Sequence, residues 1–244
     1  MPGPKILLLD IETAPNVGYT WGKWEQNVIE FAEEWYILSV AYQWYGGPTH
    51  CISLPQYGGS ERRLLLRLRE LLDEADIIVA QNGDAFDIKK INTRLLIHRI
   101  SPPSPYRSID TLKIAKQRFA FTSNKLDDIG ATLDEGRKIQ HRGFEMWKGC
   151  MAGRRTDWRD MVRYNKQDVE LLGRIYKRFI PWMTKAPNAS CYGLHCPRPG
   201  CGGTEFTARG WAYSQTKKFQ RFQCKKCHGW MQQPAGKTVV KYKT

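Results

Sequence analysis

The chain has no uninterrupted apolar stretch of about 20 residues, which is the length that a bilayer-spanning helix needs. It also lacks a secretory signal segment, because its first apolar run, Ile6–Leu9, is followed directly by Asp10. Internal repeats and low-complexity tracts are absent as well. These absences argue against a membrane-spanning or repetitive protein, and we expect a cytoplasmic one.

Acidic residues are scarce relative to basic ones. The 244 residues include 38 Lys or Arg but only 24 Asp or Glu, which gives a formal net charge of +14 and a pI near 9.5. A balance of this kind favours a polyanionic partner, and nucleic acid is the natural candidate. The length suits one substantial α/β domain with a small appendage.

The charge is spread unevenly, which indicates a domain boundary. Residues 186–244 contain ten Lys or Arg and the single acid Glu205, whereas residues 1–185 contain 28 basic and 23 acidic residues. The change coincides with the proline-containing stretch PWMTKAPNAS, whose composition is typical of a linker. We therefore predict one domain over residues 1–185 and a second over residues 186–244.

Hydrophobic periodicity predicts alternating strands and helices in the first domain, hence an α/β fold. Short apolar runs typical of buried strands cover residues 5–12, 35–47, 49–56 and 75–83, and the first three favour an antiparallel start. Apolar residues at helical spacing cover residues 61–75, 86–100, 108–119, 125–134 and 156–180. The predicted architecture is a mixed sheet flanked by helices.

Acidic residues occur where this pattern brings chain segments together. Asp10 and Glu12 are two residues apart at the end of a strand, so their side chains point to the same face. Asp87 follows a strand and a turn and begins a helix, and Asp168 lies four residues after Tyr164 on one helical face. Ligands of open α/β sheets bind at the carboxyl ends of strands, where these residues can meet.

Four clustered carboxylates repel each other unless divalent cations neutralise them, and all-oxygen ligation suits Mg²⁺ or Mn²⁺. Two such ions about 3.5–4 Å apart can activate a water and stabilise both oxygens of a phosphodiester displacement. Tyr164 is placed to orient that water, although a phenol with a pKa near 10 is not a strong base. The pattern predicts hydrolysis of a nucleic-acid backbone.

Three motifs in chain order resemble those of the DEDD exonuclease superfamily, in its tyrosine-containing subclass. They are DIET at residues 10–13, NGDAFD at residues 82–87, and Tyr164-x-x-x-Asp168. The resemblance covers roughly residues 5 to 180 and implies an RNase H-like fold with 3′-to-5′ exonuclease activity on DNA or RNA. It implies that Asp10, Glu12, Asp87 and Asp168 bind metal and that Tyr164 positions water.

Two further stretches, YTWGKWEQN and FEMWKGCMAGRRTDWRDMVRYNKQD, are similar to small stand-alone phage exonucleases. This resemblance implies a phage-encoded enzyme that acts in the host cytoplasm.

Each motif also has a simpler interpretation. A DxE after an apolar run is common, Asp87 can cap a helix, and a Tyr-x-x-x-Asp pair often lies on a helix surface. Asn82 can contact substrate or simply form an Asn-Gly turn. Asp127 and Asp128 are interpreted as a helix start rather than as metal ligands. Aromatic residues between Thr13 and Tyr36 can stack on unpaired bases or pack in the core; they are Tyr19, Trp21, Trp24, Phe31 and Trp35.

The seven cysteines include two close pairs, which predict a zinc ribbon. Cys196 and Cys201 form the first pair, and Cys224 and Cys227 form the second, with 22 residues between the two pairs. Four thiolates at this spacing bind one structural Zn²⁺ tetrahedrally. Three neighbouring residues are alternative ligands: Cys191, His195 and His228. Isolated cysteines such as Cys51 are interpreted as small buried apolar residues.

Between the zinc pairs, RGWAYSQTKKFQRFQ alternates aromatic and basic residues as a strand does. Lys217, Lys218 and Arg221 are candidate phosphate contacts, and the aromatics can stack on bases. A module that docks another protein is the alternative. We therefore predict a two-metal 3′-to-5′ exonuclease whose ribbon assists binding of single-stranded 3′ ends. The alternatives are a structure-specific endonuclease and a non-catalytic nucleic-acid-binding replication accessory protein.

Overall fold

The computed structural model describes residues 4–24, 27–183, 195–213 and 217–234. The chain divides into two compact units: one is formed by residues 5–175, and the other by residues 176–244 with the first four residues. The predicted domain boundary between residues 185 and 186 lies outside the described residues and stays a prediction. No helix within the described ranges is both long and apolar enough to cross a membrane.

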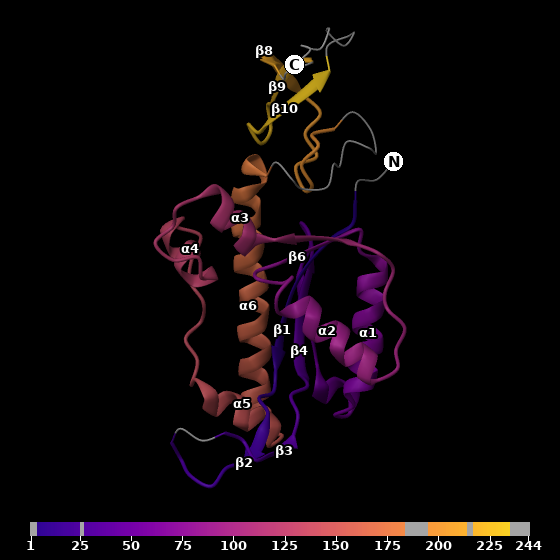
Figure 1. The fold of residues 1–244 in the computed structure, drawn as a ribbon, viewed down its shortest axis with the longest axis vertical. Coiled ribbons are helices and arrows are strands. Elements are labelled where there is room, and N and C mark those ends of the chain that lie inside the picture. Colours follow the sequence, from indigo (N-terminus) through magenta and orange to yellow (C-terminus); the bar gives the residue numbers. More distant parts are fainter. Residues whose placement is uncertain (1–3, 25–26, 184–194, 214–216, 235–244) are drawn as a thin grey trace, which may run out of the picture. The chain divides into compact units, whose positions relative to one another are not determined.

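A mixed sheet forms the centre of the first unit (Figure 1). Its order is β5-β4-β1-β6-β7, in which β4 is antiparallel to β1 and β5, whereas β6 is parallel to β1 and β7. The strands are β1 (Ile6–Thr13), β4 (Ile37–Trp44), β5 (Thr49–Ser53), β6 (Ile77–Ala80) and β7 (Arg107–Asp110). The expected antiparallel start is confirmed, and the carboxyl end of β1 lies beside the beginning of β4.

Helices cover both faces of this sheet, with α6 on one side of the strands and α1 and α2 on the other (Figure 1). The α-helices are α1 (Glu61–Glu74), α2 (Asp87–Ile97), α3 (Thr111–Arg118), α4 (Leu126–Thr132), α5 (Phe144–Met151) and α6 (Arg155–Phe179). Short 3₁₀ helices follow β5 and α6, namely η1 (Leu54–Tyr57) and η2 (Ile180–Trp182).

The double covering explains why β1 is an unbroken apolar run. Leu7, Leu8 and Leu9 are completely buried although their side chains alternate between faces. Helix α6 packs closely at Gly173, where a Cβ would lie 2.9 Å from Gln43 Oε1 and 3.4 Å from Leu8 Cδ2. Helix α6 is therefore held directly against β4 and against β1, the strand that carries Asp10 and Glu12.

The secondary-structure prediction was wrong at residues 108–110, where it began a helix, and it assigned no element to the hairpin after Thr13 or to α5. Residues 107–110 form β7 rather than the start of a helix, because the Asp110 carboxylate accepts the N–H groups of Leu112 and Lys113 and begins α3 at Thr111. The connection after Thr13 contains an antiparallel hairpin of β2 (Val17–Tyr19) and β3 (Glu30–Glu33). Both strands are exposed on their two faces, so they lack the alternation of apolar and polar residues by which a half-buried strand is recognised.

The second unit contains a three-stranded antiparallel sheet of order β10-β9-β8. Its strands are β8 (Phe206–Tyr213), β9 (Lys218–Cys224) and β10 (Trp230–Pro234). The alternation of aromatic and basic residues thus corresponds to β8 and β9.

A buried carboxylate ties three elements of the first unit together. Glu61, in the first turn of α1, accepts the N–H of Ile37 at the start of β4 (2.8 Å) and Nε of Arg94 on α2 (2.9 Å). His98 Nε2 lies 2.8 Å from the same carboxylate. Burial raises the pKa of Glu61, but the hydrogen bonds from Arg94, Ile37 and His98 outweigh burial and hold it below its ordinary value of 4.5.

We expect Glu61→Gln to lower the free energy of unfolding by about 3 kcal/mol at pH 7, because the partly buried Arg94 loses its counter-charge. A carboxylate with a depressed folded-state pKa stabilises the fold above its unfolded pKa, and this stabilisation is lost as the pH falls through the folded pKa. The difference from wild type should therefore narrow below about pH 4.5. Urea unfolding followed by circular dichroism measures this difference in the free energy of unfolding. The control is Glu70→Gln, because Glu70 belongs to an exposed ion pair. A difference that stays constant down to pH 3 would contradict this role.

Candidate metal centres

The structure brings together three of the four predicted acidic residues. Asp10 and Glu12 extend from the end of β1, and Asp168 faces them from α6. Carboxylate oxygens of the three residues lie within 4.8 Å of one another. Asp168 is almost completely buried and the other two are partly buried. The i, i+2 spacing on the strand therefore has the predicted consequence, and α6 supplies the third carboxylate.

Asp87 lies beside this cluster as the first residue of α2. Its Oδ1 accepts the N–H of Ile11 at 3.1 Å, which fixes α2 against β1 between the two acids of the first motif. Asp87 is not in the 4.8 Å group. It is nevertheless near enough for its charge to be the second-largest cause, after burial, of the raised pKa of Asp10.

Burial and mutual repulsion make the cluster costly to ionise. Burial, and then repulsion from Asp87, Glu12 and Asp168, raises the pKa of Asp10 well above its usual range. Burial and repulsion from Asp168 raise the pKa of Glu12 to about 8. Burial raises the pKa of Asp87 to about 6, against the lowering effect of the Ile11 N–H.

The donor set fits divalent cations. Oδ1 of Asp168 is buried and has no hydrogen-bond partner among the described residues. A cation bound to these oxygens would give that atom a partner and remove the repulsion within the cluster. All-oxygen ligation is the kind that Mg²⁺ and Mn²⁺ prefer.

Asn165 holds the two sides of the cluster together, and the sequence interpretation missed it. This completely buried residue donates from Nδ2 to Asp10 Oδ2 at 2.7 Å and accepts the Ser39 hydroxyl at 2.9 Å. One side chain of α6 is thereby bonded to both β1 and β4. The available signal was an amide on the apolar face of the helix, directly after Tyr164.

Lys138 enters the centre from the connection between α4 and α5 and was also missed. Its Nζ donates to Asp168 Oδ2 at 2.5 Å and to the Tyr164 hydroxyl at 3.4 Å. Its backbone N–H donates to Asp127 Oδ1 at 2.7 Å. Asp127, in the first turn of α4, thus anchors the connection and does not join the metal cluster, as the sequence interpretation held.

Tyr164 is packed so that its hydroxyl faces the acids. The edges of the His141 and Trp147 rings approach its ring, with centroids 4.7 and 6.1 Å away. Burial and the charge of Asp168 raise the pKa of Tyr164 above its usual value. The phenol therefore stays protonated, which suits it for orienting a water and excludes it as a strong base.

Asn82 lines a cavity of about 680 Å³ together with Asp10, Lys125 and Lys138. Its backbone is left-handed, with φ of 61°, and its N–H donates to Asp110 Oδ1 at 3.0 Å. At the following Gly83 a Cβ would lie 2.4 Å from the Ala80 Cβ. The turn explains the left-handed backbone of Asn82. Contact between Asn82 and substrate stays a prediction, and its place in the cavity beside Asp10 is consistent with it.

The aromatic residues near the hairpin fall into two groups. Tyr19, Trp21, Trp24 and Phe31 are 63%, 90%, 75% and 49% exposed, so core packing does not explain them. Trp35 instead lies under Lys90, whose Nζ is 3.9 Å from the ring centroid. Stacking of the exposed group on bases stays a prediction.

The four predicted zinc cysteines converge in the second unit. Their sulfur atoms lie within 4.8 Å of one another, and the Cys196–Cys227 and Cys201–Cys224 pairs are both 3.8 Å apart. A tetrahedron with Zn–S distances of about 2.3 Å has edges of about 3.8 Å. His195 and His228 are not in this group, and Cys191 lies outside the described residues.

Backbone N–H groups point at the sulfur atoms, as thiolates require. Each of the four sulfurs accepts at least one, and the donors belong to Arg198, Gly203, Lys226, Cys227 and Gly229. At Gly203 a Cβ would lie 2.7 Å from Cys224 Sγ and 3.4 Å from Cys201 Sγ, so only glycine leaves room beside the sulfurs. The cluster therefore fits one structural Zn²⁺.

The predicted phosphate contacts lie on β9 or just before it. Lys218 Nζ lies 3.9 Å from the centroid of the Trp211 ring, and the Arg221 guanidinium is 5.9 Å from that of Trp230. Trp211 and Trp230 are 39% and 50% exposed. Basic and aromatic groups are thus paired on this sheet, and Lys217 directly precedes it; their contact with nucleic acid stays a prediction.

Comparison with known proteins supports the architecture. A model of the RNase H superfamily matches residues 30–180, which include Asp87, Tyr164 and Asp168 and begin after Asp10 and Glu12. The structure of the family B DNA polymerase from the hyperthermophilic archaeon Pyrobaculum calidifontis is similar, with a TM-score of 0.56 and 16% sequence identity. The match covers 74% of this chain and 25% of the polymerase chain, so this chain corresponds to about a quarter of that protein. No curated protein matches the chain. The predicted RNase H-like fold is confirmed.

We expect one zinc ion per chain in the purified protein, measured by plasma mass spectrometry. Gly203→Ala should weaken zinc binding roughly 10- to 100-fold, because the added methyl group displaces the thiolates and the backbone N–H groups around them. Competition with a colourimetric chelator measures the affinity, and Thr204→Ala, at the exposed neighbouring residue, is the control. Unchanged affinity in Gly203→Ala would refute this arrangement.

Proposed function

Because the chain belongs to the RNase H superfamily, we propose that it is a metal-dependent 3′-to-5′ exonuclease that hydrolyses the phosphodiester bonds of DNA or RNA. Superfamily membership supports a nuclease with a nucleic-acid substrate. The observation that carries the finer proposal is the convergence of Asp10, Glu12 and Asp168 within 4.8 Å, with Tyr164 one helical turn before Asp168. The net charge of +14 suits the same substrate.

In this proposal Asp10, Glu12, Asp87 and Asp168 hold two Mg²⁺ or Mn²⁺ ions. When bound, such ions supply charge neutralisation and a polarised water. Asn165 fixes the orientation of the Asp10 carboxylate, and the Ile11 N–H fixes that of Asp87. The protonated Tyr164 hydroxyl orients the attacking water. Lys138 brings a fixed positive charge to the place where negative charge builds up on the phosphate oxygens.

The second unit adds affinity for the strand. We propose that Lys217, Lys218 and Arg221 bind phosphates while Trp211 and Trp230 offer stacking surfaces. Because the zinc module is tethered to the nuclease, weak binding by the module raises the local concentration of substrate at the centre. The preferred substrate is then a single-stranded 3′ end, with Asn82 in the cavity beside Asp10 as a further contact. The proposed location is the cytoplasm, that of the host if the chain is phage-encoded.

Digestion of labelled single-stranded DNA and RNA with Mg²⁺ or Mn²⁺ tests the activity. We expect a shortening ladder from a 5′ label and immediate mononucleotide release from a 3′ label. Asp168→Asn should reduce kcat by roughly 1,000-fold, because one metal-holding carboxylate loses its charge. Glu170→Gln, an exposed acid on the same helix, should leave the rate unchanged.

Two other results would favour one of the alternative functions. Oligonucleotide products would indicate an endonuclease that uses the same centre. Strands that are bound but not cut, with either metal, would indicate a nucleic-acid-binding accessory protein.

Lys138→Met should lower kcat by roughly 100-fold while KM changes little, because the lost charge acts mainly on the transition state. Lys125→Met is the matched control, since Lys125 lines the same cavity but makes no hydrogen bond or ion pair with Asp168 or Tyr164 among the described residues. A Lys138→Met protein that kept wild-type kcat would show that this lysine only neutralises Asp168.

A further inference from the structure

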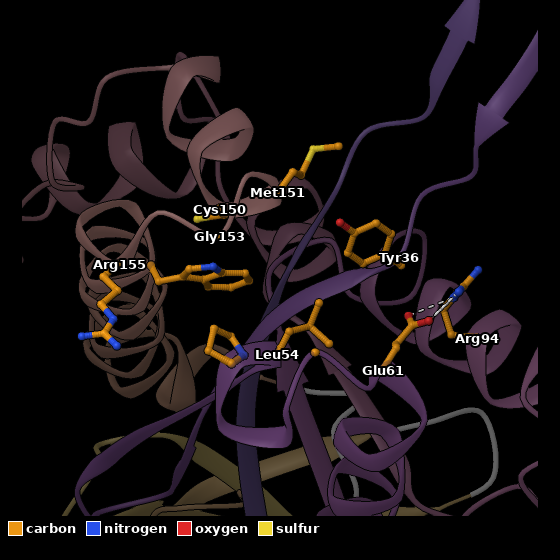
Figure 2. A pocket seen from close by; sticks show the side chains of 11 residues that line it. Tyr36, Leu54, Glu61, Arg94, Cys150, Met151, Gly153 and Arg155 are labelled. Atoms are coloured by element: carbon orange, nitrogen blue, oxygen red, sulfur yellow. Dashed lines mark hydrogen bonds and ion pairs between the residues drawn. The ribbon is translucent and has the colours of Figure 1, made fainter.

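A second cavity of about 750 Å³ lies in the first unit, where the end of α5 and the beginnings of η1, α1 and α6 meet α2 (Figure 2). It shares no lining residue with the cavity beside Asp10. Its volume falls in the range of about 300–1,000 Å³ that small-molecule sites occupy. The metal centre described above makes no use of it.

The walls combine an apolar surface with hydrogen-bond donors that have no partner in the described part of the chain. Leu54 and Met151 provide apolar surface, while Tyr36 and Trp158 provide aromatic rings. Figure 2 shows the Tyr36 hydroxyl turned toward the middle of the cavity. No described residue accepts a hydrogen bond from this hydroxyl or from the Trp158 indole. Two flat rings and two available donors suit a planar ligand that carries acceptors.

Cys150 also lines the cavity, but it is not a nucleophile there. Burial, and then the charge of Asp157, raises the pKa of this thiol to about 12. The sulfur therefore stays protonated near neutral pH and acts as an apolar wall. A site for reversible binding is indicated rather than one for covalent chemistry.

The charges of the lining leave one cation in excess. Glu61 and Arg94 neutralise each other, and the Glu61 oxygens already accept bonds from Ile37 and Arg94. Arg155 is exposed and has no acidic partner among the described residues. It is the first residue of the 25-residue helix α6, whose N-terminus adds positive potential. The rim near Arg155 thus favours an anionic group.

We infer that this cavity binds a nucleotide, with its base against Tyr36 and Trp158 and its phosphate at Arg155. Rings that stack on bases and a guanidinium that pairs with phosphate are the groups by which proteins hold unpaired nucleotides. The inference rests on the proposed function, since a nuclease meets this ligand class both as substrate and as product.

The cavity borders the metal centre through the backbone. The carbonyl of Tyr36 accepts the N–H of Ala14, two residues after Glu12, at 2.8 Å. The charge of Glu12 also contributes to the raised pKa of Cys150. The nucleotide in this cavity is therefore either the mononucleotide product after its release or a nucleotide of the bound strand away from the cleaved bond.

Equilibrium dialysis of the full-length protein against dAMP, AMP and adenosine tests the site, and anisotropy of a labelled ten-nucleotide strand provides the second arm. Both are run without added divalent cations, so that the result does not depend on hydrolysis. We expect Arg155→Gln to weaken binding of the monophosphates roughly 10-fold and to leave adenosine unchanged. Tyr36→Phe and Trp158→Leu should weaken the binding of all three ligands. Unfolding curves check that each variant folds.

Two controls sharpen the outcome. Arg159→Gln removes an exposed cation one turn further along α6, and Phe144→Leu removes an exposed ring from the beginning of α5; neither residue lines the cavity. If the monophosphates bind and the Arg155, Tyr36 and Trp158 variants weaken that binding, the cavity holds the released product. If these variants weaken binding of the oligonucleotide alone, the cavity holds a nucleotide of the bound strand. If folded Arg155→Gln and Tyr36→Phe proteins bind every ligand as wild type does, the nucleotide site is refuted even if the exonuclease activity is confirmed.

Discussion

Electrostatic repulsion among buried carboxylates is the constraint on which this structure depends. Asp10, Glu12 and Asp168 converge within 4.8 Å from β1 and α6, and the neighbouring Asp87 adds a further charge. Left to themselves such groups would separate or take up protons. The fold prevents separation by placing them on a central strand and on the beginnings or middles of packed helices. This placement costs stability and leaves a donor set that fits divalent cations.

Neutral and basic groups around the acids make this arrangement tolerable. Asn165 bonds α6 to both β1 and β4, and Lys138 brings one positive charge to Asp168. Further out, Glu61 connects α1 and β4 to α2, the helix that begins with Asp87. The ion pairs away from the centre thus have a positional role, because a small shift of α2 would change the distance between Asp87 and Asp10.

The sequence predicted the parts of this arrangement that follow from local periodicity. The i, i+2 spacing of Asp10 and Glu12 and the i, i+4 spacing of Tyr164 and Asp168 fix which side chains share a face, whatever packs around them. The cysteine pairs were equally informative, because knuckle spacing determines which sulfurs can meet. Lys138 was not predictable in this way: it reaches Asp168 from an irregular connection whose course depends on tertiary contacts such as the one with Asp127.

The two units are stabilised by different interactions, and this difference affects which residues each can carry on its surface. The nuclease unit has an extensive apolar core that can offset the cost of holding the acidic cluster. The second unit is small, and a zinc ion held by its four cysteines would supply much of its folding free energy. Its surface is therefore free to carry basic and aromatic residues such as Lys218 and Trp211. Lys138 already pairs with Asp168, and further positive charge close to the acids would compete with divalent cations for them. The proposed phosphate contacts on a separate unit would therefore attract a polyanion without weakening the cation site.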